Sequence, residues 1–220
     1  MKKILLLFIT ASLCYACEIQ YDGETRIVVQ GQLIDKNNNP VSNKKIEITT
    51  STGGTFGTSD LISYANSGAD GKFTLIFPAP KNDSISIVTS INQYQNNELQ
   101  SKTIYGLKKN FSNYKLDLNQ VVLYETKDIT QLDILLNKTT NNKQVTDIQI
   151  EGLQSNSYID LNTKKDKYQV LNTHFDVIKN QNINLSYKIL DYSNPTKPVA
   201  TDHKATIAIN SEKVIHSITY

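Results

Sequence analysis

Short runs of β-branched and aromatic residues, broken at close intervals by turn residues, constrain this chain more than any other feature. Runs of Ile, Val, Thr, Tyr and Leu alternate with polar residues and are separated by Asn, Asp, Gly and Pro clusters. This pattern is typical of half-buried β-strands joined by turns. No segment keeps apolar residues at positions i, i+3, i+4 and i+7 over three helical turns. The sequence therefore predicts an all-β protein with very little helix.

The first residues of the chain predict export. Lys2 and Lys3 precede the short apolar run 4–9, and mostly small residues follow, ending at Ala16. A positive start, a short apolar core and a small residue at the end form the layout of a cleaved signal peptide. The run is shorter than the roughly 20 apolar residues of a membrane-spanning helix. We expect residues 1–16 to be removed as a signal peptide; a buried N-terminal strand is the alternative.

The end of this segment resembles the lipobox of bacterial lipoproteins, which are acylated on a cysteine and cut just before it. Ala16 and Cys17 match the cleavage site and the lipidated residue, whereas Cys14 stands where Leu is usual and Tyr15 is bulky. Ordinary signal peptidase would cut the same bond and leave Cys17 without lipid. The resemblance implies a membrane partner through lipid on Cys17 and a lipid-anchored place at the outer membrane, on the periplasmic or the surface side.

Cysteine and charge usage set further limits. Cys17 would be the only cysteine left after cleavage, so the mature chain has no internal disulfide and depends on its apolar core. The chain has 23 Lys and Arg against 21 Asp and Glu, and two of the basic residues, Lys2 and Lys3, lie in the leader. The mature chain would carry no net charge, which argues against a nucleic-acid partner. Arg26 is the only arginine, which excludes clamps built from several arginines.

The strand pattern divides into two parts. After a lipidated Cys and tether over residues 17–25, we expect a β-sandwich over 26–124, a linker over 125–128 and a second β-sandwich-like domain of no recognised family over 129–220. Asp70-Gly71 suits the positive φ angles of a hairpin turn, and Phe73 is expected to point into the sandwich. Asn141-Asn142-Lys143 predicts a second hairpin. The fold prediction is thus two consecutive β-sandwiches.

The first of these parts carries a family resemblance. Its motifs are Val29-x-Gly31-x-Leu33-x-Asp35, then Pro40-Val41, and later Asp70-Gly71-Lys72-Phe73-x-Leu75. Together they resemble a carboxypeptidase regulatory-like domain, a small immunoglobulin-like β-sandwich common in Bacteroidetes envelope proteins. The usual Gly-Tyr after the fifth strand is absent, and Ser90-Ile91-Asn92 stands there. The resemblance implies a fold and no catalytic residues, and a shared fold does not transmit function.

One acidic motif imitates a metal site. Asp35-x-Asn37-x-Asn39 begins like a calcium loop, with oxygen ligands at alternate positions. Pro40 then stands where an EF-hand needs Gly, and Ile46 where it needs a bidentate Glu. We therefore interpret the motif as a turn, and the sequence predicts no metal and no cofactor.

The three histidines give no catalytic or metal motif. His174, His203 and His216 lie far apart and lack metal-ligand spacing. His203 beside Asp202 has the chemistry of a general base, but its place after Pro195 favours a solvated loop histidine. We therefore predict no catalytic residue.

Tyrosine is the one binding-type residue in excess, with 12 Tyr against 6 Phe and no Trp. Exposed tyrosines stack on sugar rings, but Tyr is also an ordinary residue of half-buried strands. The polar loop 92–97 is tipped by an aromatic, and its residues Tyr94, Asn96 and Asn97 form our predicted recognition loop, for a ligand that is unknown.

Three hypotheses remain for the function. The first is a non-catalytic, lipid-anchored binding or structural module at the outer membrane, with an outer-membrane protein as its partner. The second is a pilin-like or adhesive subunit that pairs through exposed strand edges. The third is a hydrolase with a dispersed site, which the absence of catalytic motifs disfavours.

Overall fold

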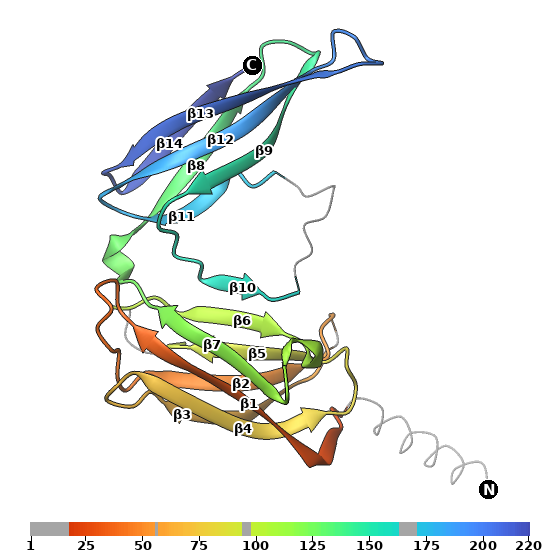
Figure 1. Cartoon of the computed structure of the whole chain (residues 1–220), viewed down its shortest axis with the longest axis vertical. Coiled ribbons are helices and arrows are strands. Elements are labelled where there is room, and N and C mark those ends of the chain that lie inside the picture. Colours follow the sequence, from red (N-terminus) through yellow and green to blue (C-terminus); the bar gives the residue numbers. More distant parts are fainter. Residues whose placement is uncertain (1–17, 56, 94–97, 163–170) are drawn as a thin grey trace, which may run out of the picture. The chain divides into compact units, whose positions relative to one another are not determined.

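The computed structural model describes residues 18–55, 57–93, 98–162 and 171–220 (Figure 1). These residues form fourteen strands and two short 3-10 turns, Lys108–Asn110 and Thr126–Asp128. The described chain divides into two compact units. Unit 1 contains residues up to 93 together with 100–123 and 157–162, and unit 2 contains 98–99, 124–156 and 171–220. The predicted all-β class is confirmed.

Unit 1 is a sandwich of a three-stranded and a five-stranded sheet. The three-stranded sheet has the order β4-β1-β7, and the five-stranded sheet the order β10-β6-β5-β2-β3. The strands are β1 (Tyr21–Ile34), β2 (Lys45–Ser51), β3 (Ser59–Asn66), β4 (Lys72–Pro80), β5 (Ser86–Ile91), β6 (Lys102–Gly106), β7 (Lys115–Val122) and β10 (Tyr158–Asp160).

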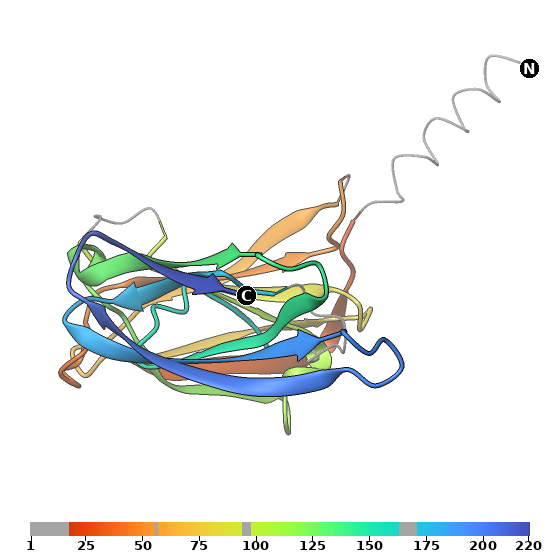
Figure 2. The same cartoon turned by 90° about the horizontal axis from the view of Figure 1, so that it is seen from above.

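Unit 2 is a sandwich of two three-stranded sheets, in the orders β11-β8-β14 and β13-β12-β9. Strands β12 and β13 are the longest of the unit and pair without a register shift (blue in Figure 2). The strands are β8 (Ile129–Asn137), β9 (Lys143–Glu151), β11 (His174–Ile178), β12 (Gln181–Asp191), β13 (Val199–Ile209) and β14 (Lys213–Thr219).

The two units follow the same path through their sheets. In unit 1, the first strand, β1, lies between the antiparallel strand β4 and the last strand, β7, which runs parallel to it. In unit 2, the first strand, β8, lies in the same way between the antiparallel β11 and the parallel β14. The second strand of unit 1, β2, pairs with β5, which pairs in turn with β6. The second strand of unit 2, β9, pairs with β12, which pairs in turn with β13. The second unit thus repeats the topology of the first.

One segment breaks this repeat. In unit 1, β3 follows β2 and pairs with it, whereas the connection between β9 and β11 supplies β10, which pairs in parallel with β6 of unit 1 (Figure 1). Residues 157–162 therefore belong to unit 1, although the sequence placed them in a domain over 129–220. The sequence could not predict this, because β10 has only three residues, too few to show an alternation of apolar and polar side chains, and its partner β6 is distant in sequence.

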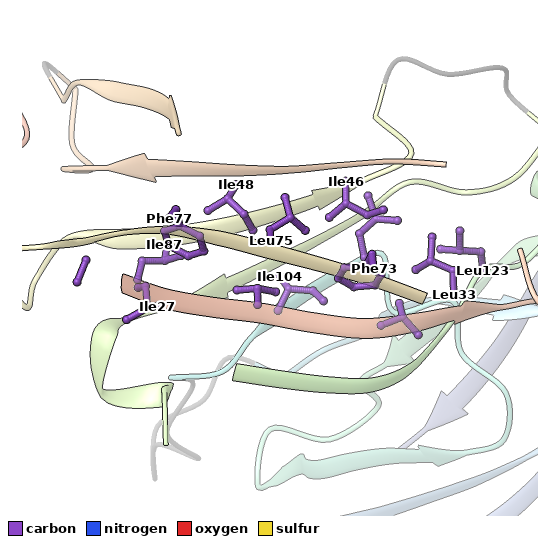
Figure 3. Close-up of a cluster of buried hydrophobic side chains, with 14 residues drawn as sticks. Ile27, Leu33, Ile46, Ile48, Phe73, Leu75, Phe77, Ile87, Ile104 and Leu123 are labelled. Atoms are coloured by element: carbon purple, nitrogen blue, oxygen red, sulfur yellow. The ribbon is translucent and has the colours of Figure 1, made fainter. Parts of the chain in front are cut away.

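The core of unit 1 follows from strict alternation along its strands. In β4, every second residue from Phe73 to Phe77 is buried and the residues between are exposed. Ile46 and Ile48 of β2 point to the same core (Figure 3). The prediction that Phe73 points into the sandwich is confirmed, since only 4% of it is exposed.

Two glycines allow close contacts in this core. A Cβ on Gly31 would lie 3.0 Å from Cζ of Phe73, its partner across the β1–β4 ladder. Gly71 has a φ of +74°, as predicted, and a Cβ there would lie 2.3 Å from the Leu33 carbonyl oxygen. Close packing, together with the positive φ of Gly71, therefore explains three residues of the sequence motifs: Gly31, Gly71 and Phe73.

Three local predictions from the sequence are wrong. The Asp70-Gly71 turn joins β3 and β4, and the turn before Lys143 joins β8 and β9, but neither pair of strands is hydrogen-bonded. In both cases the chain passes from one sheet of the sandwich to the other. Turn residues determine that the chain reverses direction, but they do not determine which strands then form hydrogen bonds with each other. Residues 18–25 are no free tether, since Ile19 is buried and the hydroxyl of Tyr21 bonds to Asp60 at 2.9 Å.

Replacing Gly71 with Val should destabilise unit 1 by well over about 1 kcal/mol, because backbone strain adds to the clash with Leu33. Thermal melting of the variant provides the measurement. Gly53→Val is the matched control, since Gly53 has a φ of +68° but open space around its missing Cβ. Equal melting of the two variants would contradict the proposed role of the contact.

Replacing Phe73 with Ala should cost roughly 3–5 kcal/mol, the usual range for a buried Phe. Denaturant unfolding measures this loss. Leu61, which is 55% exposed, supplies the control Leu61→Ala, for which little change is expected. A Phe73→Ala variant as stable as the control would show that the ring does not pack in the core.

Candidate functional site

The sequence-predicted anchor and recognition loop lie outside the described residues. These are Ala16 and Cys17 in the leader, and Tyr94, Asn96 and Asn97 in the loop. The base of that loop is described: the Asn92 amide donates to the Lys45 carbonyl at 2.9 Å, and Asn92 Nδ2 donates to the Gln100 carbonyl at 3.2 Å. Burial lowers the pKa of the neighbouring Lys102 to about 8. The described residues on either side of this segment, Asn92, Gln100 and Lys102, are therefore buried and polar.

The calcium-like motif is a turn, as predicted. Asp35 Oδ1 accepts hydrogen bonds from the Asn37 and Asn39 amides, each at 2.8 Å, and Oδ2 accepts one from Asn39 Nδ2 at 3.0 Å. These bonds, those from Asn39 above all, lower the pKa of Asp35. The carboxylate is engaged by its own loop.

One histidine lies in an ion cluster on the outer face of unit 2. Nδ1 of His174 (β11) lies 2.8 Å from Asp133 Oδ1 (β8), and Nζ of Lys213 (β14) lies 2.7 Å from Asp133 Oδ2. The hydrogen bond from Lys213, then that from His174, lowers the pKa of Asp133. In the described part of the chain, His174 bonds to no hydroxyl nucleophile through its other ring nitrogen. The cluster is an ion-pair network across three strands.

The other histidines lie on strands. His203 was expected in a polar loop, and this is wrong: it lies on β13, and its ring stacks on Tyr187 at 5.1 Å between centroids. The prolines precede the strand, which starts at Val199. His216 is half-buried on β14. Among the described residues, no group of three His, Cys, Asp or Glu side chains is arranged to hold a metal ion.

Asp133 should make the stability of unit 2 depend on pH in the acidic range. Because its pKa is lowered in the folded state, its contribution is present above the unfolded pKa of about 3.9 and is lost as pH falls through the folded value. Asp133→Asn should therefore lower the melting temperature at neutral pH, and the difference should shrink below about pH 4. The control Asp176→Asn, which changes an exposed β11 carboxylate that forms no ion pair with the described residues, should show no such difference. A constant difference across this pH range would contradict the role of the ion pairs.

The five-stranded sheet of unit 1 carries an exposed aromatic surface on its outer face. The pairing registers align one row of outward residues across all five strands, and this row runs Tyr64, Glu47, Ser90, Thr103, Tyr158. A second row beside it runs Leu61, Thr49, Val88, Tyr105, Asp160. We call these two rows the tyrosine face.

Large, exposed side chains stand at both ends of the tyrosine face, whereas Ser90 and Val88 in its middle are buried. Tyr64 is 69% exposed and Tyr158 is 62% exposed, on strands that lie roughly 19 Å apart across the sheet. Tyr105 packs against Tyr158 at 4.7 Å between ring centroids. Lys45 lies 5.5 Å from the centre of the Tyr64 ring and pairs with Glu47 at 2.5 Å. The face thus offers phenol rings at its ends and a neutralised charge pair between them.

Tyr158 belongs to this surface because β10 joins unit 1. The Thr103 amide donates to the Ser157 carbonyl at 2.8 Å, and the Leu161 amide donates to the Tyr105 carbonyl at 2.9 Å. Ile159, between them, packs on the core of unit 1. Tyr158 is therefore held on the face by a strand whose sequence position gave no indication of it.

Unit 2 has a different outer surface. The outer face of its β13-β12-β9 sheet has hollows of about 500 and about 440 Å³. Their linings include Glu151, Asn184 and Lys204 in the first and Asp147 and Lys188 in the second. Charged and apolar groups both line these hollows, and the one tyrosine among their linings, Tyr187, is half-buried.

Comparisons with known proteins give weak likenesses. Neither a protein-family model nor a curated protein matches the chain. Among solved structures it is similar to shaft pilin SpaA from Lactobacillus rhamnosus GG, at 9% identity and a TM-score of 0.36 over 88% of this chain and 98% of that one. It is also similar to the major pilin SpaD from Corynebacterium diphtheriae, at 7% identity and a TM-score of 0.32 over 86% of this chain and 68% of that one.

An enzyme is among the similar structures as well. The likeness to 3-chlorocatechol 1,2-dioxygenase from Rhodococcus opacus 1CP has 11% identity and a TM-score of 0.33, and it covers 50% of this chain. The chain spans 62% of the length of that enzyme. Likenesses this weak to pilins and to an enzyme do not distinguish between functions.

Proposed function

We propose that this chain is a non-catalytic, lipid-anchored envelope protein that binds a partner at the outer membrane through the tyrosine face. The observation that carries the proposal is the alignment of Tyr64 and Tyr158 at the two ends of one row, both well exposed. Tyrosine combines a large apolar area with a hydroxyl that hydrogen-bonds, and it is enriched where proteins bind one another. An outer-membrane protein is the partner that fits an anchored module.

The anchor part of the proposal rests on the sequence. Lys2, Lys3 and the short apolar run precede Ala16 and Cys17, which resemble a lipobox. Within the described residues, no helix has the length and apolar character needed to cross a membrane. Since Ile19 is buried, a lipid on Cys17 would hold unit 1 close to the bilayer surface.

Replacing Cys17 with Ala should release the protein from membranes into the soluble fraction, because several acyl chains supply the anchoring energy at about 0.8 kcal/mol per buried CH₂. Fractionation of the producing cells and the intact mass of the mature chain provide the measurements. Cys14→Ala, in the leader, is the control and should leave the protein in membranes. A Cys17→Ala protein that still pellets with membranes would refute the anchor.

Tyr64→Ala and Tyr158→Ala should each weaken retention of the partner by at least about tenfold, as expected for buried aromatic anchors of an interface. The immobilised protein is exposed to detergent-solubilised outer-membrane proteins, and the retained species is quantified. Tyr114→Ala is the matched control, since Tyr114 is 65% exposed and lies outside the tyrosine face. Equal retention by all three variants would refute the face as the binding surface.

A second candidate function is a pilin-like or adhesive subunit that polymerises by strand pairing. The observation that favours it is the addition of β10 to the edge of β6 through backbone hydrogen bonds. A sheet edge of this fold therefore accepts an added strand, which is the contact that strand-addition assemblies use. Polymers of the purified mature chain in light scattering would support this candidate, and a strictly monomeric or dimeric protein would refute it.

A further inference from the structure

The edge of β13 is the most open strand edge of the described structure. All eleven residues of β13 pair with β12 on one side, and the described residues place no strand on the other side. The topologically equivalent edge in unit 1, that of β6, is covered by β10. Unit 2 therefore leaves open an edge that unit 1 closes.

Most of the other edge strands carry features that hinder further pairing, and β14, which is also unbroken and free of proline, is shorter than β13. β4 contains Pro78 and Pro80, and β3, β7 and β9 contain register shifts. Asn119 of β7 and Asp147 of β9 have positive φ at these shifts. Prolines, bulges and short strands are the usual protections of a sheet edge. β10 and β11 are short, whereas β13 is long, unbroken and free of proline within its span.

Only two charged residues interrupt β13, and they are placed symmetrically about His203. Asp202 precedes His203 and Lys204 follows it, and both point outward between the inward-facing His203 and Ala205. Neither forms an ion pair in the described structure: Lys188, opposite Asp202 on β12, lies 3.7 Å from Asp147 instead. A two-fold axis through His203 would place each Asp202 opposite the Lys204 of another copy.

We propose that β13 pairs antiparallel with β13 of a second copy of this chain, about a two-fold axis at His203. The contact joins two β13-β12-β9 sheets into one continuous sheet by backbone hydrogen bonds, with two Asp202–Lys204 ion pairs. The same register puts Val199, which is 62% exposed, opposite Ile207. An isologous contact of this kind closes on itself, because the same surface is used by both partners. This inference is independent of the lipid anchor and of the tyrosine face.

Disulfide trapping on the proposed axis tests the pairing in the full chain as the cell produces it. Directly opposite residues of antiparallel strands have Cα atoms about 4.5 or 5.5 Å apart, within the range of a disulfide. His203→Cys should therefore give a linked dimer of twice the chain mass under mild oxidation. The matched control on the same strand is Thr206→Cys, whose two copies would lie roughly 20 Å apart and should not link.

The wild-type chain is the second control, because it reports any linkage through Cys17. A dimer band for His203→Cys alone supports the proposal. Its absence, or an equal band for Thr206→Cys, overturns it. A linked species of another mass would show that a different protein occupies the edge, and this also overturns the pairing of two copies.

Charge exchange tests the register. In a chain that already carries His203→Cys, Asp202→Lys should reduce the linked fraction at least about tenfold, because it places two like-charge pairs across the axis. The double change Asp202→Lys with Lys204→Asp should restore linking, since opposite charges face each other again. Circular dichroism checks that each variant is folded. Linking that is insensitive to Asp202→Lys, or is not restored by the double change, would overturn the proposed register.

Discussion

The sandwich of unit 1 depends on the backbone around Leu33, where three segments meet. The Leu33 amide donates to the Gly71 carbonyl at 2.9 Å, and its own carbonyl accepts from the Val41 amide at 2.9 Å. Gly71 must come so close to Leu33 that no Cβ fits between them. This contact fixes where β4 leaves the turn, so Phe73 reaches Gly31 across the ladder. Without this contact, the alternating buried residues of β4 would not be fixed in their register with β1.

Three local features of the sequence predicted the local structure correctly. The Asp35 turn, the positive φ of Gly71 and the buried Phe73 follow from short-range chemistry, and all three are confirmed. Pairing between distant strands was not predictable in the same way. The turn residues at Gly71 do not indicate that β4 pairs with β1. Nothing in the sequence distinguishes Tyr158 from the other eleven tyrosines, and only the strand register shows that it lies in the same row as Tyr64. The tyrosine face thus depends on long-range pairings that periodicity does not contain.

The repeated topology explains why the two units offer different surfaces. In each unit the last strand returns to lie parallel beside the first strand: β7 beside β1 in unit 1, and β14 beside β8 in unit 2. The connection after the second strand is where the two paths differ. In unit 1 it becomes β3 and extends the sheet, whereas in unit 2 it supplies β10 to β6. This pairing of β10 therefore completes the tyrosine face and leaves unit 2 with a smaller sheet.

Closed and open edges favour different kinds of recognition. In unit 1, β10 uses the backbone groups of the β6 edge, so a partner meets a sheet face, where side chains such as Tyr64 and Tyr158 determine specificity. In unit 2, β13 still presents backbone donors and acceptors, which are the same for every sequence. Selectivity at the β13 edge must therefore come from the few β13 side chains that an unsuitable partner strand would leave without complementary contacts. Asp202 and Lys204 are such a pair, because only a strand with the reverse order of charges satisfies both, and an antiparallel copy of β13 has that order.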